Sequence, residues 1–487
     1  MQELVNTAHQ HGIYVILDII LNHSGDVFAY DADRYSAQSE RGEPFMDARW
    51  DNRPYRVKGY RNDLGQSNVP FATVNLHTHS QAWPDQAIWP VELQHPETFS
   101  CKGRISNWDY DPEFREGDFW SLKDIHHGKH NYDANGNRMI DDFYPSAALR
   151  ALCDIYKFWI AFADVDGYRI DTVKHMEPGA TRYFTSVIQE YAQSLGKENF
   201  YLIGEITGGR KFAFEIMETT GLSAALGIDD IPDRLEYLAK GYRNPKAYFD
   251  LFRNSAQEQK GSHVWYGKHI VTLFDDHDQV RKGNDKGRFC SYGGYAYLPA
   301  VLALNLTTIG IPCLFYGSEQ AFDGAGASDI FLRECMFGGQ FCSFQSINRH
   351  FFNEDHPIYR LIASIVAIRK QRLALRRGRQ YLRQISATGE EGSFGYPQLW
   401  GQRLLSVVPW SRIFDKEEIV LAINTDVEMA RTVWVTLDYN LHQNNENILT
   451  CTYSTDAAQI NTTYPVENKN GKAVRLTVPA GGFVIYE

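Results

Sequence analysis

Six apolar stretches, each about as long as one β-strand, alternate with longer segments of helical periodicity along the chain. They read YVILDI, DGYRID, FYLIGE, SAALGI, HIVTLF and IPCLFYG, and they run from residue 14 to residue 317. Strands joined through helices run parallel, and near-continuous apolar strands such as YVILDI are typical of a sheet that is buried on both faces. Two architectures satisfy this pattern, a doubly wound sheet and a (β/α)8 barrel.

The polar residues that follow these strands favour the barrel. No G-x-G-x-x-G turn follows the first strand, so a dinucleotide-binding sheet has no support. A single acid after a strand can simply cap the next helix, but clusters after four strands indicate the catalytic face of a TIM barrel. The clusters are Asp18, Asn22 and His23; Arg169, Asp171, Lys174 and His175; Glu205; and Asp276, His277 and Asp278.

The alternation of strands and helices is interrupted once and stops before the C-terminus. Residues 24–145 are rich in Asp, Asn, Gly, Pro and Trp, which predicts a loop-rich inserted domain. Residues 376–487 hold short alternating segments such as EIVLAIN and GFVIYE, which predict a C-terminal antiparallel β-sandwich domain. The barrel is therefore assigned to residues 1–23 and 146–375.

The strand count of the predicted barrel is short. Six strands can be counted, and closure of a (β/α)8 barrel needs eight. One helix, from Met1 to His11, precedes the first strand and has no N-cap residue. The expectation is a barrel truncated at its N-terminus by roughly 60 residues or more, with the insert after the third strand of the complete fold. Exposed strand edges would then make this chain alone poorly soluble or inactive.

Composition limits the partners. The formal net charge is -11 with no block of like charge, which disfavours nucleic acid. No apolar run is long enough to span a bilayer, so no membrane partner is expected. The first residues do not read as a signal peptide, which favours a cytoplasmic location. The seven dispersed cysteines argue against a disulfide framework.

The four clusters resemble the signatures of the alpha-amylase family of glycoside hydrolases in order, spacing and residue type. DIILNH contains the family's Asp and Asn-His pair, DGYRIDTVKH matches the second signature almost letter for letter, and LIGEIT contains the Gly-Glu of the third. The fourth signature usually reads Asn-His-Asp and here reads Asp-His-Asp from Asp276. A fifth, in the insert, resembles SLKDI, which begins at Ser121. The resemblance covers residues 1–375, and the remainder fits the family's C-terminal β domain.

The resemblance implies a retaining hydrolase of alpha-1,4-glucans such as starch and glycogen. Retention needs one carboxylate as nucleophile and one carboxylic acid as acid/base, and the matching residues are Asp171 and Glu205. Asp278 would hold the hydroxyls of the distorted sugar. Arg169 shares a strand face with Asp171 and would keep that carboxylate ionised, whereas Asp171 and Asp278 would keep Glu205 protonated.

Further residues are implied as sugar ligands. His23 and His277 would donate hydrogen bonds at the cleavage point, and Lys174 and His175 would reach sugars on the leaving-group side. The same catalytic set serves alpha-glucosidases and glucan transglycosylases, which stay open as alternatives. A non-catalytic protein of the same fold would have lost the carboxylates that this chain keeps. Aromatic residues of the insert could line a glucan cleft or simply pack; they are Trp50, Trp83, Trp89 and Trp120.

The resemblance also bears on ions. The family often carries a structural calcium ion, and the matching ligands are Asn22, Asp124 and the backbone carbonyl of His175, unless Asp124 merely caps a turn. A second stretch, DANGNRMIDD, begins like an EF-hand loop but has Arg138 where that loop needs Gly, which predicts an Asx-rich turn instead. Chloride-binding members use Asn at the position of Asp276. Because an acid repels an anion, no chloride dependence is expected.

Overall fold

The computed structural model describes residues 1–31, 36–38, 44–46, 48–62, 64–69, 93, 95–120, 122–228, 230–252, 263–337, 350–443 and 447–487. Trp83, Trp89 and Ser121 lie outside the described residues. The chain forms two compact units, Met1–Ile228 and Asp229–Glu487. Their division falls inside the barrel segment 146–375 assigned from the sequence, and those domain boundaries stay a prediction.

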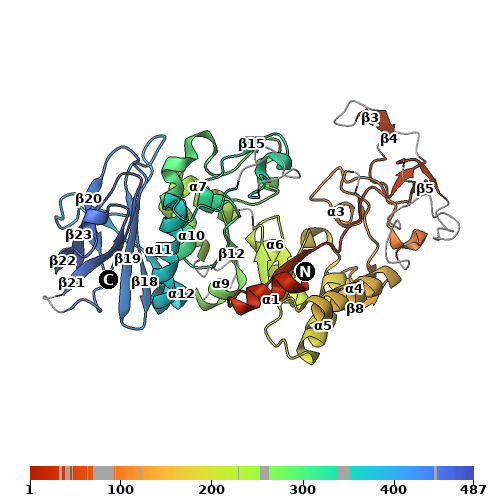
Figure 1. Cartoon of the computed structure of the whole chain (residues 1–487), viewed down its shortest axis with the longest axis horizontal. Helices are drawn as coiled ribbons and strands as arrows, with labels where there is room; N and C mark the ends of the chain where they lie inside the picture. The colour runs from red at the N-terminus through yellow and green to blue at the C-terminus, as the bar shows by residue number, and fades with distance from the viewer. Residues whose placement is uncertain are drawn as a thin grey trace. The chain divides into compact units, whose positions relative to one another are not determined.

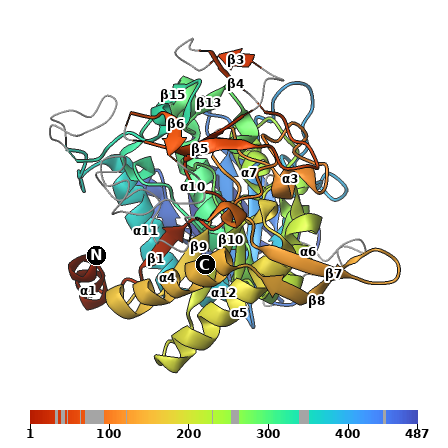
Figure 2. The same ribbon diagram turned by 90° about the vertical axis from the view of Figure 1, so that its right-hand side faces the viewer.

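A four-stranded parallel sheet forms the centre of the first unit, in the order β1-β9-β10-β11 (Figure 2). The strands are β1 (Ile16–Ile19), β9 (Gly167–Ile170), β10 (Tyr201–Glu205) and β11 (Ala224–Leu226). Asp18 of β1 lies in register with Arg169 of β9, and Ile203 of β10 is also the partner of Arg169. The carboxyl ends of these strands therefore meet at one edge, with Asp171 directly after β9 and Glu205 closing β10.

Strand β1 corrects one expectation. Within the described residues it is hydrogen-bonded to β9 alone. Its apolar sequence predicts burial on both faces, but Tyr14 is 80% exposed, Ile16 41% and Ile20 47%. The prediction is wrong for this strand, because the face that carries these residues and Asp18 is largely open, while Ile19 on the other face is 3% exposed. On the neighbouring strands Ile170 and Leu202 are fully buried, and both lie on the face opposite to Arg169.

Helices α4 (Ala147–Ala163) and α5 (Pro178–Ser194) pack on each other beside this sheet. Helix α4 begins at Ser146, whose Oγ accepts a hydrogen bond from the Leu149 N–H at 3.0 Å. Helix α5 begins with Pro178, whose fixed φ suits a first helical position. Helix α1 (Gln2–Gln10) packs on α4, and α6 (Arg210–Thr220) packs on α5.

The described residues between β1 and α4 form only short elements, as a loop-rich insert predicts. They are β2 (Phe28–Tyr30), β3 (Ser36–Gln38), β4 (Pro44–Met46), β5 (Val57–Arg61), β6 (Ser67–Val69), η2 (Pro96–Thr98), α3 (Glu113–Glu116), β7 (Gly128–Tyr132) and β8 (Arg138–Pro145). Strands β7 and β8 form a hairpin. Its turn confirms the predicted Asx-rich turn, because Asp133 Oδ1 accepts hydrogen bonds from the N–H groups of Asn135 and Asn137, both at 2.8 Å.

The second unit continues the alternation of helices and strands. HIVTLF and IPCLFYG each contribute one strand, β12 (Val271–Thr272) and β14 (Ile311–Pro312), which pair in parallel. The number of strands in the whole barrel stays a prediction. The other elements before the C-terminal sheet are α7 (Asp230–Ala239), α8 (Pro245–Phe249), η4 (Asp250–Phe252), α9 (His263–His269), η5 (Val280–Lys282), β13 (Lys286–Gly287), η6 (Ser291–Tyr297), α10 (Leu298–Thr307), η7 (Ser318–Gln320), β15 (Ala325–Gly326), η8 (Asp329–Leu332), α11 (Pro357–Gln371) and α12 (Leu373–Arg377).

The last part of the chain is a nine-stranded antiparallel sheet (Figure 1), which confirms the predicted antiparallel C-terminal domain. Its order is β16-β18-β19-β24-β21-β22-β23-β20-β17. Val420 and Val484 from one half share a core with Val435 and Leu476 from the other. The elements are β16 (Arg379–Leu382), β17 (Ile385–Ser386), β18 (Val407–Phe414), β19 (Glu417–Asn424), β20 (Arg431–Thr436), β21 (Ile448–Ser454), η9 (Ala457–Gln459), β22 (Thr463–Glu467), β23 (Ala473–Val478) and β24 (Phe483–Tyr486).

A buried carboxylate ties parts of this sheet together. Glu418 of β19 lies 2.6 Å from Arg383 Nη2 and 3.1 Å from His442 Nε2. It also accepts hydrogen bonds from Ser411 Oγ at 2.5 Å and from the Asp438 N–H at 2.9 Å. A charge with this many donors is satisfied although it is removed from water.

A buried guanidinium caps the C-terminal ends of helices α10 and α12. Arg412 of β18 donates to the Thr307 carbonyl oxygen at 2.5 Å and to the Gly378 carbonyl oxygen at 3.0 Å. Burial lowers the pKa of Arg412 to about 9, and nearby Arg369 adds to the effect. These bonds satisfy carbonyl groups that have no partner inside their own helices.

Two absences hold over the described part of the chain. No helix there combines the length and apolar character needed to cross a membrane. The six cysteines described are all free, in line with the dispersed spacing in the sequence.

Candidate active site

Arg169, near the end of β9, bridges three carboxylates. Its Nη1 donates to Asp18 Oδ1 at 2.9 Å and to Asp171 Oδ1 at 2.6 Å, while Nη2 lies 2.9 Å from Glu205 Oε2. Burial acts to lower the pKa of Arg169, but Glu205, Asp18 and Asp171 together raise it above its ordinary value. The guanidinium therefore stays charged and offsets the negative charge gathered at this edge of the sheet.

Glu205 has surroundings that the sequence did not predict. Its Oε2 accepts a hydrogen bond from the Thr172 N–H at 3.0 Å, and the Arg169 guanidinium lies against the same oxygen. Its side chain is 14% exposed, close to the 15% of Asp171. Both contacts place a donor against this oxygen, and the protonation of Glu205 stays a prediction.

The turn after β9 fixes this contact. Thr172 has φ 49° and ψ 36°, in the left-handed region that β-branched residues rarely adopt. This conformation turns the backbone directly after Asp171, so that the Thr172 N–H donates to Glu205 Oε2. Unfavourable backbone geometry of this kind tends to occur at functional sites.

His23 lies beside Asp171 and packs on the ring of Phe119. His23 Nε2 is 4.0 Å from Asp171 Oδ2. Burial lowers the pKa of His23, and the charge of Asp171 only partly opposes this, so the ring is neutral at neutral pH. The Phe119 ring contacts the rings of His23 and His175, with centroids 5.1 Å and 4.6 Å away.

Lys174 and His175 both have protein partners. Lys174 Nζ lies 3.4 Å from Asp109 Oδ1 in the insert. His175 is buried, and its Nδ1–H donates to the Phe114 carbonyl oxygen at 2.6 Å. Burial lowers the pKa of His175 to about 4. The neutral, hydrogen-bonded ring of His175 positions the turn that carries Lys174. This structural contact comes in addition to the predicted sugar contact of His175.

The predicted calcium ligands Asn22 and Asp124 come from paired segments. The Ile125 N–H donates to the Asn22 carbonyl at 2.9 Å, and His23 and Asp124 form an isolated antiparallel bridge. The side chains of Asn22 and Asp124 are buried, and neither Asn22 Oδ1 nor Asp124 Oδ1 has a hydrogen-bond partner among the described residues. Burial, with the nearby Asp118, raises the pKa of Asp124 well above its ordinary range. Buried oxygens without donors fit a hard cation.

No described group of three or more His, Cys, Asp and Glu side chains is arranged to hold a metal. An ion at Asn22 and Asp124 would therefore need backbone carbonyls or water as further ligands, as the predicted His175 carbonyl would provide.

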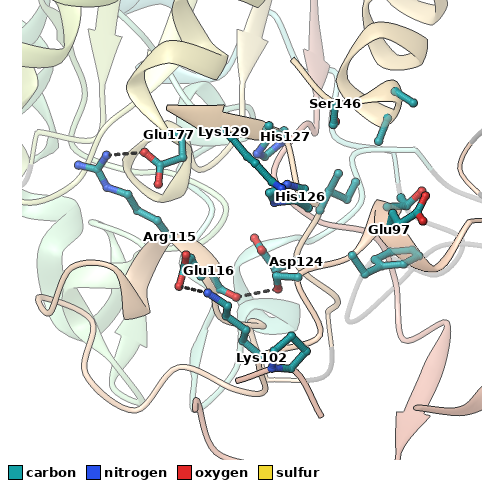
Figure 3. A pocket seen from close by; sticks show the side chains of 18 of the residues that line it. Glu97, Lys102, Arg115, Glu116, Asp124, His126, His127, Lys129, Ser146 and Glu177 are labelled. Atoms are coloured by element: carbon teal, nitrogen blue, oxygen red, sulfur yellow. Dashed lines mark hydrogen bonds and ion pairs between the residues drawn. The ribbon is translucent and has the colours of Figure 1, made fainter. Parts of the chain in front are cut away.

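Asp124 also lines a cavity of about 520 Å³ in the first unit (Figure 3). Across this cavity Lys102 Nζ lies 2.7 Å from Glu116 Oε2, and Arg115 Nη1 lies 3.3 Å from Glu177 Oε2. Four of its charged groups are thus paired with one another. The SLKDI motif contributes Asp124 and Ile125 to its wall, and the rest comes from separate loops and from the start of α4 and α5.

The second unit holds Asp278 and His277, which follow β12. His277 Nε2 lies 3.0 Å from Asp278 Oδ2, and Arg333 Nη2 donates to Asp278 Oδ1. Arg333 Nε also donates to the His277 carbonyl oxygen at 3.0 Å. Arg333 was not identified from the sequence, because it lies far along the chain and outside any signature.

The unusual Asp276 has a clear structural contact. Its Oδ1 accepts hydrogen bonds from the N–H groups of Asp278, at 2.9 Å, and Gln279. Its Oδ2 lies 3.3 Å from Arg281 Nη1. The carboxylate therefore shapes the turn that carries Asp278, with its charge balanced by Arg281.

Carboxylates gathered at the carboxyl ends of adjacent parallel strands, bridged by one guanidinium, are typical of a catalytic site of a (β/α)-barrel protein. Residues 1–343 match the family model described as "Alpha amylase, catalytic domain". The chain belongs to the alpha-amylase family, with that family's TIM barrel and a C-terminal antiparallel sheet domain.

Relatives in this family include hydrolases and transferases. The chain is 24% identical to the alpha-amylase of Streptomyces lividans over 402 residues, covering 78% of this chain and 40% of that protein. It is 26% identical to the cyclomaltodextrin glucanotransferase of Klebsiella oxytoca over 309 residues, covering 57% of this chain and 41% of that protein. The chain therefore spans less than half the length of these curated relatives.

Solved structures show the same fold. The alpha-amylase of Geobacillus thermoleovorans in complex with acarbose has a TM-score of 0.59 and 16% identity, covering 100% of this chain and 79% of that one. A cyclomaltodextrin glucanotransferase with a three-domain ABC distribution has a TM-score of 0.62 and 19% identity, covering 100% of this chain and 77% of that one.

Proposed function

We propose that the chain acts as a retaining glycoside hydrolase on alpha-1,4-glucans of the starch and glycogen type, through a covalent glycosyl-enzyme. The observation that carries this proposal is the shared guanidinium. Asp171 and Glu205 contact the two terminal nitrogens of Arg169 at 2.6 Å and 2.9 Å, which holds their carboxyl groups close together. Retention requires carboxyl groups only about 5–5.5 Å apart, whereas inversion requires a wider gap that admits water.

In this mechanism Asp171 attacks the anomeric carbon while Glu205 donates a proton to the departing sugar oxygen. Glu205 then removes a proton from water as water releases the sugar from Asp171. Arg169 donates a hydrogen bond to Asp171 Oδ1 and holds this carboxylate in position. The neutral ring of His23 would donate a hydrogen bond to the sugar at the cleavage point.

Four further side chains are proposed as substrate ligands. His277 and Asp278 would hold sugar hydroxyl groups. Lys174 and His175 would lie toward the leaving-group side. The pairs Lys174–Asp109 and Asp278–Arg333 support this proposal, because each holds a long or charged side chain in a fixed position.

An alpha-glucosidase or a glucan transglycosylase is the alternative within the same mechanism. The similarity to cyclomaltodextrin glucanotransferases supports the transglycosylase as an alternative. The two activities differ in whether water or a second sugar releases the glycosyl-enzyme. Chromatography of products from maltoheptaose distinguishes them, since transfer gives products longer than the substrate.

We also propose a structural calcium ion held by Asn22, Asp124 and the His175 carbonyl. The support is the pair of buried oxygens, Asn22 Oδ1 and Asp124 Oδ1, that have no donor among the described residues. When bound, the ion would supply positive charge that joins the insert to the end of β1. It takes no part in the proton transfers.

Trapping with a fluorinated glucosyl inhibitor tests the assignment of the nucleophile. Peptide mass spectrometry should find the label on Asp171, and Asp171→Asn should abolish labelling. Asp18→Asn is the matched comparison, because Asp18 contacts the same Arg169 nitrogen but is 55% exposed, and labelling of Asp171 should persist there. Label on Asp278, or label that survives Asp171→Asn, contradicts the assignment.

A further inference from the structure

Arg281 holds the turn after β12 that carries Asp278 at two points. It lies in η5, and its side chain is only 7% exposed. Its Nη1 lies 3.3 Å from Asp276 Oδ2 inside the turn, and its Nη2 donates to the Phe274 carbonyl oxygen at 3.2 Å where the turn begins. Asp276 Oδ1 accepts the Asp278 N–H at 2.9 Å, so a single carboxylate links Arg281 to the backbone of Asp278.

Two acids of helix α7 hold the same guanidinium. Arg281 Nε lies 2.7 Å from Asp233 Oδ1, and its Nη2 lies 3.5 Å from Glu236 Oε2. Burial acts to lower the pKa of Arg281, but the nearby carboxylates, led by that of Asp276, raise it above its ordinary value. Each of its three nitrogens therefore contacts an acceptor, which fixes the plane of the charged group.

The backbone of the turn needs such support. Gln279 has φ 42° and ψ 49°, in the left-handed region that residues other than glycine rarely adopt. Its side chain is buried, and its Oε1 accepts the Gly287 N–H at 2.9 Å. An unfavourable backbone conformation persists only where the surrounding contacts determine it. Asp276 is one such contact, because it also accepts the Gln279 N–H, and Arg281 holds Asp276.

Asp276 brings to this arrangement a charge that the usual Asn of the family lacks. The amide oxygen of an Asn could accept the same two N–H groups, but its second polar atom would be a donor and not an acceptor for Arg281. The carboxylate supplies that acceptor, and a hydrogen bond between two charged groups is stronger than one between neutral groups.

We infer that Arg281 is a positioning residue for Asp278, which acts through Asp276 and is itself held by the two acids of α7. This inference rests on the proposed function, in which Asp278 holds sugar hydroxyl groups. If the turn relaxed, the Asp278 carboxylate would lose its fixed position. The cost would fall on the transition state, where the contact with the distorted sugar matters most.

Arg281→Met tests this inference, with Arg234→Met as the matched control. Arg234 belongs to α7, and its Nη1 donates to the Ala247 carbonyl oxygen at 2.7 Å, so each variant loses guanidinium contacts within the same unit. With maltoheptaose, Arg281→Met should lower kcat and kcat/KM together by about 10- to 100-fold and change KM less than about twofold. Arg234→Met should leave kcat and KM unchanged.

Two further variants test the route through Asp276. Adding Asp276→Asn to Arg281→Met should raise kcat above that of Arg281→Met alone, because it removes the unpaired charge and keeps an acceptor for the Asp278 N–H. Arg281→Lys keeps the charge but not the planar group, and it should lower kcat in the same way if Arg281→Met does not fold. The inference would be overturned by an unchanged kcat in the Arg281 variant, by an equal loss in Arg234→Met, or by a double variant no better than Arg281→Met.

If the wild type does not cleave maltoheptaose, the proposed function fails on its own. Hydrogen exchange then decides the inference. Peptides from residues 275–289 should exchange faster in the Arg281 variant than in the wild type, and they should not do so in Arg234→Met. Unchanged exchange of these peptides in the Arg281 variant would show that Arg281 does not hold the turn.

Discussion

Replacing Glu418 with Gln should remove a pH-dependent part of the stability of the C-terminal sheet. Burial acts to raise the pKa of Glu418, but hydrogen bonds from His442 and Ser411, the charge of Arg383 and the Asp438 N–H lower it from 4.5 to about 2. The difference between these pKa values corresponds to about 3 kcal/mol of unfolding free energy at neutral pH. Because the folded pKa is the lower one, this contribution is complete above about pH 4.5 and is lost as the pH falls toward 2.

Hydrogen exchange followed by mass spectrometry measures this locally, in peptides from β18 and β19. After correction for intrinsic exchange rates, Glu418→Gln should reduce the free energy of opening by about 3 kcal/mol at pH 7 and by about 1.5 kcal/mol at pH 3. Glu417→Gln is the matched control, since Glu417 is 41% exposed with Arg372 at 3.9 Å, and it should change little. A Glu418→Gln deficit that is the same at both pH values would refute the reasoning.

Three further outcomes are expected. Arg412→Met should lower the free energy of unfolding by about 2 kcal/mol in urea titrations, because two buried carbonyls lose their donor. The control Arg475→Met, on the exposed side of β23, should be nearly neutral. Equal effects of the two substitutions would contradict this. A calcium chelator should lower the melting temperature of the wild type but not that of Asp124→Asn, since an ion bound only by the folded state stabilises that state. If the chelator leaves the melting temperature of the wild type unchanged, the ion is excluded. Added sodium chloride should not raise glucan hydrolysis beyond sodium nitrate at equal ionic strength, because Asp276 places a negative charge where an anion would bind; activation specific to chloride would contradict this.

Much of the site at the sheet edge follows from sequence, because strand order and register are repetitive. Apolar runs mark β1, β9 and β10, and parallel pairing brings the residues after each run to the same edge. Asp18, Arg169, Asp171 and Glu205 could therefore be placed together. Which oxygen each nitrogen of Arg169 contacts depends on side-chain conformations and on the turn after β9, and no spacing rule contains that information.

Other features depend on contacts between residues far apart in the chain. Arg383, Ser411, Glu418 and His442 each read as an isolated polar residue, and only the order of the antiparallel sheet brings them around one buried carboxylate. The prediction that β1 is buried on both faces failed for the opposite reason. Apolar composition reports a tendency to be buried, but whether an element covers that face is a property of the whole fold.

The left-handed backbone of Thr172 has a consequence for protein engineering. A glycine would adopt the same φ without steric conflict, so Thr172→Gly is a natural choice in a search for heat-resistant variants. It would also allow the peptide to rotate, so the N–H that now donates to Glu205 at 3.0 Å would no longer have a fixed direction. At this position, thermal stability and the geometry of the proposed catalytic site favour different residues. A screen that selects only for thermal stability would therefore lose the hydrogen bond that orients Glu205.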